Sequence, residues 1–526
     1  MKRRTLLAGS AGAAGLALAA CSAKHGMTGG FSGASPERGH LLRSAARPAP
    51  GGATNTMRVK TTRVLIAGGG VAGLAAARAL RLRGIDDFRL LELEDAAGGN
   101  SRGGDVGGIA CPLGAHYLPT PGDDAHEVQD LLEELGLRRR VAGRWTYDER
   151  HLCHSPQERL FFNGEWHEGL LPVQGVGAAT LGQYRRLARL VDEARRASQF
   201  AIPAFRAPAS AAHRALDTLT FDAWLAQQGL EDPHLRWYLD YCCRDDYGAG
   251  LKTVSAWAGI HYFASRHGFS APGGDAVEKD SVLTWPEGNG WLARQLAAPL
   301  NDRLLAGRVV TRIAEGRNGV EVDAFDVKAQ AAERWQADHC IVALPLFIAA
   351  RVVDGAPGFL RDAAARTRYA PWAVANIHIR EPLHDRPGAP PSWDNVIYGS
   401  AGLGYVDAMH QSLRPEPGPT VLTCYRALGD VPDGRAQLLD QPWTHWRDTL
   451  LAEFNAPHPD LAAKATRIEV ARYGHAMSIP VPGVASAAKP ASLSAGRLQF
   501  AHSDWAGYSI FEEAFTLGHL AGSRIA

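Results

Sequence analysis

Short blocks of hydrophobic residues alternate with glycine-rich turns after residue 60 of the chain. Val64–Ala67 is an apolar run without polar interruption, which is typical of a buried parallel strand. The alanine-rich segment Leu74–Arg83 has the composition of a helix that ends near Gly84. A second apolar run, Phe88–Leu91, completes the pattern. This order predicts a strand–helix–strand unit with a parallel sheet.

The remaining pattern divides into strand-like and helical regions. Val309–Ile313 and Ala337–Leu344 are further strand-like runs, and residues 370–480 alternate similar runs such as Ala373–Ile379 and Val421–Tyr425. Earlier in the chain the pattern is mostly helical, and the predicted helices are His126–Leu137, Gly182–Ser198, Phe221–Gln228 and Asp232–Asp240. An α/β part and a mixed α+β part therefore alternate along the sequence.

Composition narrows the class of protein. The 526 residues are 46% hydrophobic, which is enough for one large core or two or three coupled cores. The 56 Lys and Arg residues balance 55 Asp and Glu residues without a long charge block, so the charge pattern argues against a nucleic-acid partner and favours small molecules. No run beyond the first residues approaches the roughly 20 apolar residues of a transmembrane helix.

The first residues have the pattern of an export signal. Arg3 and Arg4 form a twin arginine, and a short apolar stretch ends in Leu18–Cys21. This ending resembles the bacterial lipobox, in which Cys21 becomes the acylated first residue, and a plain cleavable signal is the alternative. Twin-arginine signals export folded proteins, commonly with a cofactor already inserted. We therefore predict a signal over residues 1–21, a periplasmic location and a lipid at Cys21 as the sole membrane anchor.

Residues 22–58 are rich in Gly, Ser, Ala and Pro and lack hydrophobic periodicity, so we predict a flexible tether. Six cysteines remain after Cys21, an even number that fits an oxidising compartment. However, Cys340 lies in a predicted buried strand, and Cys242 and Cys243 are adjacent. We therefore expect no disulfide framework.

A glycine loop joins the first predicted strand to its helix. Gly68, Gly70 and Gly73 form the GxGxxG pattern in the strand-to-helix context that it requires. The glycines permit a tight turn and a close approach of the backbone to a pyrophosphate, and the helix N-terminus offers free N–H groups. Glu92 follows the second strand, 19 residues after Gly73, where a carboxylate accepts both ribose hydroxyls and repels a 2′-phosphate. The motif predicts FAD or NAD and disfavours NADP.

Two further segments resemble the flavin-containing amine oxidase superfamily. Gly98–Gly99 follows Glu92 by six and seven residues, as a second glycine pair does in that superfamily. Near the C-terminus, Gly496–Asp504 followed by Gly507–Tyr508 and Phe511–Ala514 is similar to its flavin segment, where a strand delivers an acidic residue and a helix begins beside the flavin. The resemblance favours FAD over NAD.

The resemblance implies an α/β fold, with a discontinuous Rossmann-like FAD-binding domain and a mixed α+β substrate domain. The implied FAD-binding domain comprises residues 60–118, 283–350 and 490–526, and the substrate domain comprises residues 119–282 and 351–489. Asn100 replaces the arginine that usually follows the glycine pair, which leaves Arg102 as the expected phosphate partner. The expected FAD contacts are Gly68, Gly69, Gly70, Ala72, Gly73, Glu92, Gly98, Gly99, Arg102, Val310, Asp504 and Glu512.

The chain departs from the superfamily on the substrate side. Amine oxidases of the superfamily carry a lysine on a central strand, whereas the corresponding run Trp372–His378 contains none. Tyr508 corresponds to one wall of the aromatic cage, and Ala476 stands at the other. His475 stands where some relatives have a cysteine bonded to the flavin, so we expect noncovalent FAD.

Tyr508 and His475 are the candidate catalytic residues. If the pH profile shows a limb near neutrality, His475, with an ordinary pKa of about 6.5, is the group to which we would assign it. The resemblance implies oxidation of an amine or amino-acid-like small molecule by hydride transfer to FAD, with O2 or another acceptor taking the electrons. The missing lysine keeps two alternatives open. One is a desaturase-type dehydrogenase that forms C=C bonds, and the other is a redox-neutral isomerase or binding protein.

Two groups of polar residues have simple structural explanations. Arg244–Tyr247 suits either a charged substrate or a salt-bridged turn between helices, and we favour the turn. His261, His378, His410 and His475 are dispersed without the spacing of metal ligands. We therefore predict no metal site.

Overall fold

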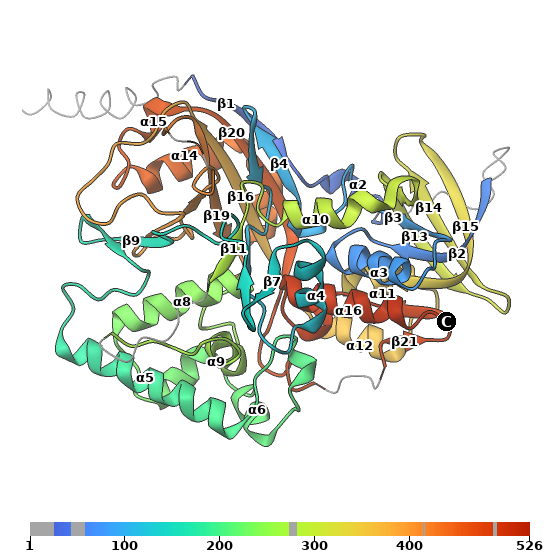
Figure 1. The fold of residues 1–526 in the computed structure, drawn as a ribbon, viewed down its shortest axis with the longest axis horizontal. Coiled ribbons are helices and arrows are strands. Elements are labelled where there is room, and N and C mark those ends of the chain that lie inside the picture. Colours follow the sequence, from blue (N-terminus) through green and yellow to red (C-terminus); the bar gives the residue numbers. More distant parts are fainter. Residues whose placement is uncertain (1–25, 44–57, 273–280, 413, 415, 488–491) are drawn as a thin grey trace, which may run out of the picture.

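Two large mixed sheets dominate the computed structural model, which describes residues 26–43, 58–272, 281–412, 414, 416–487 and 492–526 (Figure 1). We call the sheet that carries the glycine loop sheet I, and the other sheet II. The expected signal lies outside the described residues. The architecture confirms the predicted α/β class, with a Rossmann-like unit joined to a mixed α+β unit.

Sheet I collects strands from distant parts of the chain. Its order is β12–β3–β2–β15–β14–β13, and β22 pairs with the end of β15. The strands around β2 are parallel, whereas β13, β14 and β15 form an antiparallel meander. The bounds are β2 Arg58–Ala67, β3 Phe88–Leu91, β12 Leu304–Leu305, β13 Arg308–Glu315, β14 Val320–Asp326, β15 Ala331–Val342, β21 Ser494–Ala495 and β22 Leu498–Phe500.

Helices α3 (Val71–Leu82) and α16 (Phe511–Ser523) lie side by side on one face of sheet I (Figure 1). Their backbones approach closely, because a Cβ on Gly518 would lie 2.0 Å from the Ala72 carbonyl oxygen and one on Gly522 would lie 2.5 Å from that of Ala76. This packing brings the C-terminal segment beside the glycine loop. α4 (His126–Glu134) and α10 (Gly290–Ala297) complete this layer.

The opposite face of sheet I is covered by α11 (Leu346–Val352) and α12 (Gly358–Arg366). Leu360 of α12 is fully buried in the same core as Val310 and Phe500. The structural unit built on sheet I therefore continues beyond residue 350, where we expected it to stop. The reason is that α12 follows α11 directly and packs on it.

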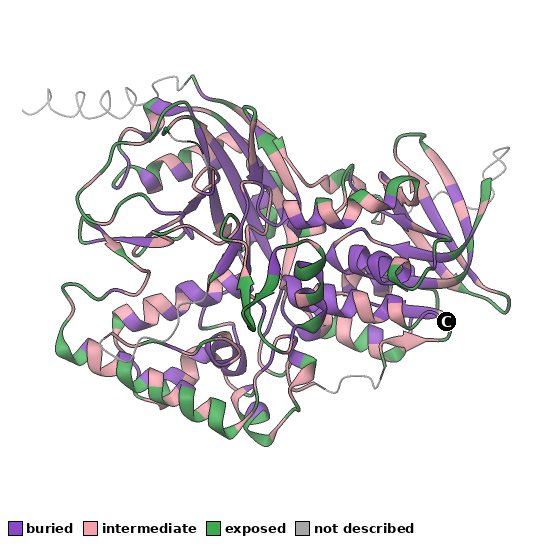
Figure 2. Cartoon of the chain, in the orientation of Figure 1, coloured by how far each residue is buried: buried purple, intermediate pink, exposed green. Residues whose placement is uncertain are grey.

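Sheet II forms the second unit, in the order β1–β20–β16–β19–β18–β17–β9–β10. The long strand β16 is mostly buried, as its purple colour in Figure 2 shows. Its neighbour β20 combines buried and partly buried residues. The bounds are β1 Thr28–Ser32, β9 Glu158–Phe162, β10 Glu165–Glu168, β16 Arg368–Ile379, β17 Asp394–Ile397, β18 Tyr405–Asp407, β19 Thr420–Ala427 and β20 Ala465–Ile479.

Helical layers cover both faces of sheet II. On one face, α5 buries Thr180, Tyr184, Leu187 and Val191, a single stripe along the helix, and leaves its outer side exposed (Figure 2). This layer contains α5 Ala178–Ala197, α6 Ala211–Leu216, α7 Phe221–Gln227, α8 Pro233–Tyr247 and α9 Ala256–Ala264. The other face packs against α13 Gly434–Asp440, α14 Trp443–Phe454 and α15 Leu461–Lys464.

Short hairpins and 3-10 helices connect these layers. The hairpins are β4 Gly103–Val106 with β5 Ile109–Pro112, β6 Tyr117–Pro119 with β11 Val282–Thr284, and β7 Arg138–Val141 with β8 Arg144–Tyr147. The 3-10 helices are η1 Gly99–Ser101, η2 Ala204–Arg206, η3 Ala298–Arg303 and η4 Ser503–Ala506. The Asn376 side chain of β16 donates to the Pro112 carbonyl at 3.0 Å, which fixes the β4–β5 hairpin on sheet II.

Helix α8 differs from its prediction. We expected it to end at Asp240 and assigned Arg244–Tyr247 to a turn, but α8 continues through Tyr247. It ends at Gly248, whose φ of 74° is the left-handed conformation that commonly terminates a helix. The charged residues of this stretch therefore occupy the last turn of a helix.

Residues 26–43 also differ from the prediction of a flexible tether. They form β1, which pairs in parallel with β20, and the short helix α2 (Pro36–His40). Met27 is buried in the core of sheet II. The sequence pattern missed this element because its pairing uses backbone groups, which require no hydrophobic alternation.

Three further predictions concern features that the described residues lack. No described helix is long and apolar enough to cross a membrane. The six cysteines after Cys21 are all free, and the described part contains no group of His, Cys, Asp or Glu suited to a metal ion.

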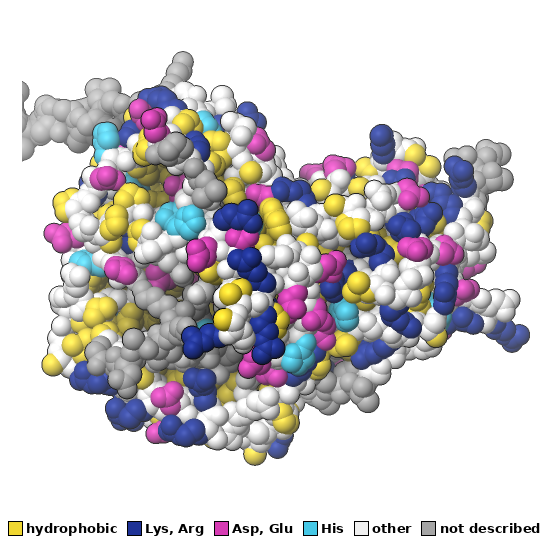
Figure 3. All heavy atoms as spheres, viewed as in Figure 1, with side chains coloured by type: hydrophobic (Ala, Val, Ile, Leu, Met, Phe, Trp, Pro, Cys, Tyr) yellow, Lys and Arg dark blue, Asp and Glu magenta, His cyan; other side chains and the backbone are white. Residues whose placement is uncertain are grey.

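On the face seen in Figure 3, Lys and Arg side chains are interspersed with Asp and Glu.

Candidate functional site

A cavity of about 440 Å³ lies between the glycine loop of sheet I and the strands of sheet II. Its nucleotide-loop end includes Gly70 and Glu92, and its sheet II end includes Trp372 of β16 and Tyr425 of β19. Of the expected FAD contacts, the cavity wall contains Gly68, Gly69, Gly70, Ala72, Glu92, Gly98, Gly99, Val310, Asp504 and Glu512. The wall thus gathers residues from all three segments of the predicted FAD-binding domain.

The four glycines of the first loop have different physical roles. Gly68 has a φ of 101°, and a Cβ there would lie 2.3 Å from the Ala343 carbonyl oxygen. Gly73 lies outside the cavity wall. A Cβ at this position would lie 1.9 Å from the Gly68 carbonyl oxygen, so α3 can pack on the loop only because glycine has no side chain. A Cβ on Gly69 would lie 2.7 Å from the Glu92 carboxylate. These three glycines shape the loop itself.

Gly70 has no such internal requirement. Its φ of −69° is ordinary for any residue, and a Cβ there would meet nothing within 4 Å. It caps the N-terminus of α3 and faces the cavity, where the helix supplies unpaired N–H groups and partial positive charge. The space beside Gly70 therefore fits a phosphate group that approaches the backbone.

Glu92 is held rigidly at the end of β3. Its two carboxylate oxygens accept hydrogen bonds of 2.8 Å from the backbone N–H groups of Gly69 and Glu94. Burial raises the pKa of Glu92, and these two N–H donors and the charge of Arg102 oppose that rise. Each oxygen keeps further lone pairs, as recognition of two ribose hydroxyls requires.

The second glycine pair adjoins the first loop. Gly98 pairs with Gly70 in an isolated β-bridge, and both Gly98 and Gly99 have positive φ values, 127° and 57°. Arg102, the expected phosphate partner, is not part of the cavity wall. Its guanidinium donates to the carbonyl oxygens of Gly99 and Gly33, at 3.1 and 3.2 Å. Arg102 therefore supports the loop from behind.

Asp504 and the side chain of Asn289 complete the polar wall. Asp504 accepts hydrogen bonds from the Tyr369 hydroxyl at 2.6 Å and the Leu346 N–H at 3.1 Å. Burial raises its pKa, but the charge of His502 and these donors outweigh burial and lower it. Asn289 lines the cavity, and its Oδ1 atom is buried without a hydrogen-bond partner among the described residues. Such an atom fits a polar ligand.

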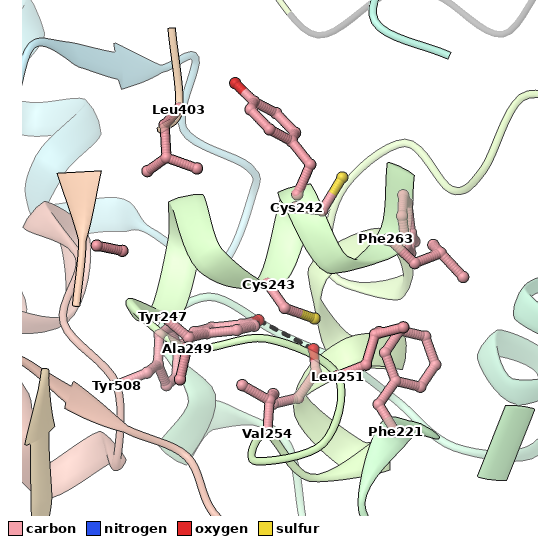
Figure 4. Close-up of a cluster of buried hydrophobic side chains, with 14 of the residues drawn as sticks. Phe221, Cys242, Cys243, Tyr247, Ala249, Leu251, Val254, Phe263, Leu403 and Tyr508 are labelled. Carbon is pink, nitrogen blue, oxygen red and sulfur yellow. Dashed lines mark hydrogen bonds between the residues drawn. The ribbon is translucent and has the colours of Figure 1, made fainter. Parts of the chain in front are cut away.

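Tyr508 does not reach the cavity. Figure 4 shows it within a cluster of buried side chains that includes Tyr247. Its hydroxyl donates to Glu513 at 2.7 Å and lies 3.2 Å from His261. The chain turns at Gly507, whose φ is 89°, and this turn directs Tyr508 into the helical layer. Ile510, immediately before α16, lines the cavity instead, so the predicted aromatic wall is absent here.

His475 lines the cavity but cannot titrate near neutrality as expected. Its ring stacks on that of Phe347 with centroids 4.4 Å apart. Burial, followed by the positive charges of Arg435, Arg43 and His40, lowers its pKa to about 4. A kinetic pKa near 7 therefore has to come from another group.

Sequence reasoning missed the charged wall at the sheet II end of the cavity. Asp245 and Asp246 project from the last turn of α8, and Arg266 lies beyond the end of α9, 3.8 Å from Asp246. Glu512, in the first turn of α16, joins them. Among the described residues, three carboxyl groups thus share one guanidinium in this part of the wall. The run Arg244–Tyr247 was the available signal, and we had assigned it to a turn.

The pKa values in this wall are shifted by burial. Burial, with the nearby charge of Asp246, raises the pKa of Asp245 to about 7. Burial also raises the pKa of Glu512 to about 7, against the opposing charge of Arg266. In addition, the last turn of a helix disfavours negative charge, so the position of Asp245 and Asp246 is unfavourable unless a cation lies nearby. The arrangement is suited to a positively charged ligand.

The remaining wall at this end is aromatic and apolar. It includes Tyr117, Trp372, Val374 and Tyr425, and also His116, whose pKa burial lowers to about 3. No lysine and no cysteine occurs among the described residues that line the cavity. The lysine that is missing from the Trp372–His378 strand is therefore not supplied by another described residue of the cavity wall. The absence of cysteine from this lining fits noncovalent binding of a cofactor.

A glycine cradle, a buried glutamate at the end of β3 and a second sheet over the same cavity are typical of enzymes that bind a dinucleotide. The model of the family described as "flavin containing amine oxidoreductase" matches residues 71–526. The chain belongs to this family, and it is an FAD-dependent oxidoreductase. A comparison with curated proteins found no match at a significant level.

Solved structures show the same fold. Putrescine oxidase bound to putrescine aligns with a TM-score of 0.66 and 17% identity, over 88% of this chain and 99% of that one. Cyclohexylamine oxidase from Brevibacterium oxydans aligns with a TM-score of 0.63 and 19% identity, over 88% and 98%. A fatty acid isomerase from P. acnes that produces CLA aligns with a TM-score of 0.57 and 15% identity, over 87% and 97%.

Proposed function

We propose that this enzyme oxidises a small amine, or an amino-acid-like molecule, that binds as a cation. The observation that carries the proposal is the wall of Asp245, Asp246 and Glu512, which opens into the FAD cavity with Arg266 as the described guanidinium in that part of the wall. Arg244, outside the wall and paired with Asp240, also acts on Asp245, so the three carboxyl groups still exceed the cations that are left for them. A buried set of charges with excess carboxylate is costly unless protons or a cation neutralise it. Two of the similar folds belong to proteins named as oxidases of amines, which supports the proposal.

The residues of the chain have separate roles in this proposal. Asp245 attracts and orients the cationic end of the substrate, while Arg266 stays paired with Asp246 and limits the charge of the wall. Trp372 and Val374 exclude water from the donor carbon. Bound FAD would supply the acceptor for a hydride, which carries both electrons of the C–H bond next to nitrogen, and O2 or another acceptor would then take those two electrons. The ammonium group loses one proton in this oxidation, so that the product is an iminium ion.

A second candidate reaction has support from specific observations. The lysine expected of amine oxidases is absent, Ile510 replaces an aromatic wall, and Arg266 in the same wall suits a carboxylate-bearing substrate. The fold also occurs in a fatty acid isomerase. This candidate is a dehydrogenation that forms a C=C bond, or a redox-neutral isomerisation.

One panel of substrates separates the two candidates. We expect an amine, diamine or amino acid to bleach the flavin absorbance of the purified enzyme without oxygen, and readmitted O2 or a dye acceptor to restore it. Unsaturated fatty acids with chains about as long as those of the amines serve as the comparison set. If no amine bleaches the flavin while a fatty acid is isomerised without net bleaching, the amine proposal is wrong.

We also propose that the protein is exported folded, with FAD in place, and is anchored in the periplasm by a lipid at Cys21. The support is in the sequence: Arg3–Arg4, the Leu18–Cys21 ending, and a fold that is completed around a cofactor. Residues 1–25 lie outside the described part of the structure.

Lysine substitutions at Arg3 and Arg4 test this route. We expect the double variant to accumulate as folded, yellow precursor in the cytoplasm, because the export machinery no longer recognises the signal. Cys21→Ala, in contrast, is expected to abolish acylation and leave flavin content unchanged. Fractionation with a cytoplasmic marker enzyme checks both. Normal periplasmic amounts of the double-lysine variant would rule out twin-arginine export.

A further inference from the structure

Residues 26–43, which we call the N-terminal strap, form part of the wall of the FAD cavity. Gly39 and Leu42 line the cavity on the side of Glu92 and Val310. Leu42 also packs against the core beneath that side. The strap precedes residue 71, where the match to the family model begins.

The strap is built to dock on sheet II. Its strand β1 pairs with β20 from Thr28 opposite Arg467 to Ser32 opposite Ala471. A Cβ on Gly29 would lie 2.4 Å from the Ile468 carbonyl oxygen, so this position in the pairing requires glycine. Strand pairing of this kind fixes a segment through its backbone.

Polar contacts then tie the strap to the loop that follows Glu92. The backbone N–H of Ser35 donates to the Glu94 carboxylate at 2.8 Å. Arg38 donates to the Leu93 carbonyl at 3.1 Å and to both carboxylate oxygens of Asp95 at 2.9 Å. Both Asp95 contacts come from one guanidinium nitrogen, and the Asp95 side chain is 83% exposed, so they contribute little. The part-buried contacts to Leu93 and Glu94 therefore contribute more to holding the strap.

A second connection runs to the second glycine pair. Gly33, with a φ of 80°, presents its carbonyl to Arg102, whose Nε donates to Gly99. Arg102 also lies 4.0 Å from the Glu94 carboxylate, and that carboxylate faces Arg38 at 3.8 Å. The strap therefore contacts the loop that follows Glu92 and, through Arg102, the second glycine pair.

We propose that the N-terminal strap is a cofactor-retention element: once docked, it closes the side of the cavity next to Glu92 and slows the release of FAD. Leu42 and Gly39 supply the wall, and Arg38 positions them through Leu93. Cofactor binding and strap docking stabilise each other, because both restrain the same loop.

Measurement of FAD release from the full-length holoenzyme tests this proposal. We expect Arg38→Ala and Leu42→Ala each to raise the rate of FAD release by about 10-fold, as recovery of free-flavin fluorescence reports. Glu37→Ala and Leu41→Ala are the matched controls, since both side chains lie on the exposed side of the same segment. Release rates equal to wild type in both test variants would overturn the proposal.

Hydrogen exchange of the wild-type protein gives a second readout that needs no substitution. Addition of FAD to the apoprotein is expected to slow exchange of the amides of residues 28–32 and 35–43. If FAD leaves exchange there unchanged, the strap does not respond to the cofactor and the proposal is wrong. The readouts require no substrate, so they do not depend on which oxidation the enzyme performs.

Discussion

Gly70→Val is expected to produce a folded protein that has lost FAD. The position tolerates a side chain, because its φ is −69° and a Cβ would meet nothing within 4 Å of the protein. The valine would instead occupy the space at the N-terminus of α3 where the loop approaches a phosphate. We expect FAD affinity to fall by at least about 100-fold, which corresponds to about 2.7 kcal/mol. Flavin absorbance of the purified protein and titration of the apoprotein with FAD measure this loss.

A matched control exists at the start of another helix. Gly177 caps α5 with a φ of −81° and is exposed, and a Cβ there would also meet nothing within 4 Å. Gly177→Val changes the same type of position far from the cavity, and FAD content should stay at the wild-type level. Thermal unfolding of the two apoproteins should agree closely. Full flavin occupancy in Gly70→Val would show that the phosphate does not approach this loop.

Most of the FAD contacts that we expect from the sequence line one cavity, because the nucleotide end depends on local structure. Gly68, Gly70 and Glu92 lie within one strand–helix–strand unit, so their spacing along the chain fixes their arrangement in space. The loop itself predicted FAD or NAD, and the resemblance of the second glycine pair and of the C-terminal segment to the amine oxidase superfamily then favoured FAD. Gly73 was expected to contact FAD, but in the structure it allows α3 to pack on the loop. The spacing of the glycines along the chain does not distinguish these two roles.

The substrate end could not be predicted because it depends on details of chain direction. A single turn at Gly507 moves Tyr508 away from the cavity and brings Ile510 to it. The extension of α8 to Gly248 converts a presumed turn into a helix end that presents Asp245 to the cavity. Both outcomes follow from left-handed glycines, whose conformation is not evident from the residue type alone.

The strap illustrates a different limit. Thr28–Ser32 contains two glycines and no alternation of hydrophobic and polar residues, so composition favoured a tether. Its partner, β20, lies more than 400 residues away in sequence, and the pairing uses backbone groups that any sequence has. Only the steric need for glycine opposite Ile468 marks the site, and this becomes visible once the two strands are placed together.

Asp245→Asn is expected to weaken the binding of cationic substrates far more than it changes the chemical step. The substitution keeps the shape of the side chain and removes its charge from a buried wall. Loss of one charge-assisted contact costs about 1.5–3 kcal/mol, so KM for an amine should rise roughly 10- to 100-fold, with a smaller change in kcat. Steady-state kinetics with an amine from the substrate panel measures the two constants separately.

The pH dependence gives the same residue a distinct signature. Because burial raises the pKa of Asp245 to about 7, its carboxyl is ionised above that pH and protonated below it. The wild-type kcat/KM for a cationic amine should therefore fall as pH decreases through about 7, and this limb should be reduced in Asp245→Asn. Burial also raises the pKa of Glu512 to about 7 and raises that of Asp246, so Glu512→Gln tests whether Glu512 supplies a limb that remains in Asp245→Asn.

Competitive inhibitors separate a charge effect from a change of shape. An alkylammonium inhibitor and an alcohol of the same chain length fill the same space, but only the first carries a positive charge. Asp245→Asn should weaken inhibition by the ammonium and leave inhibition by the alcohol close to the wild-type value. Equal weakening of both would show that Asp245 shapes the cavity, and an unchanged KM, pH limb and ammonium affinity would place the cation site elsewhere. Because His475 has a pKa near 4, it cannot supply this limb in its place.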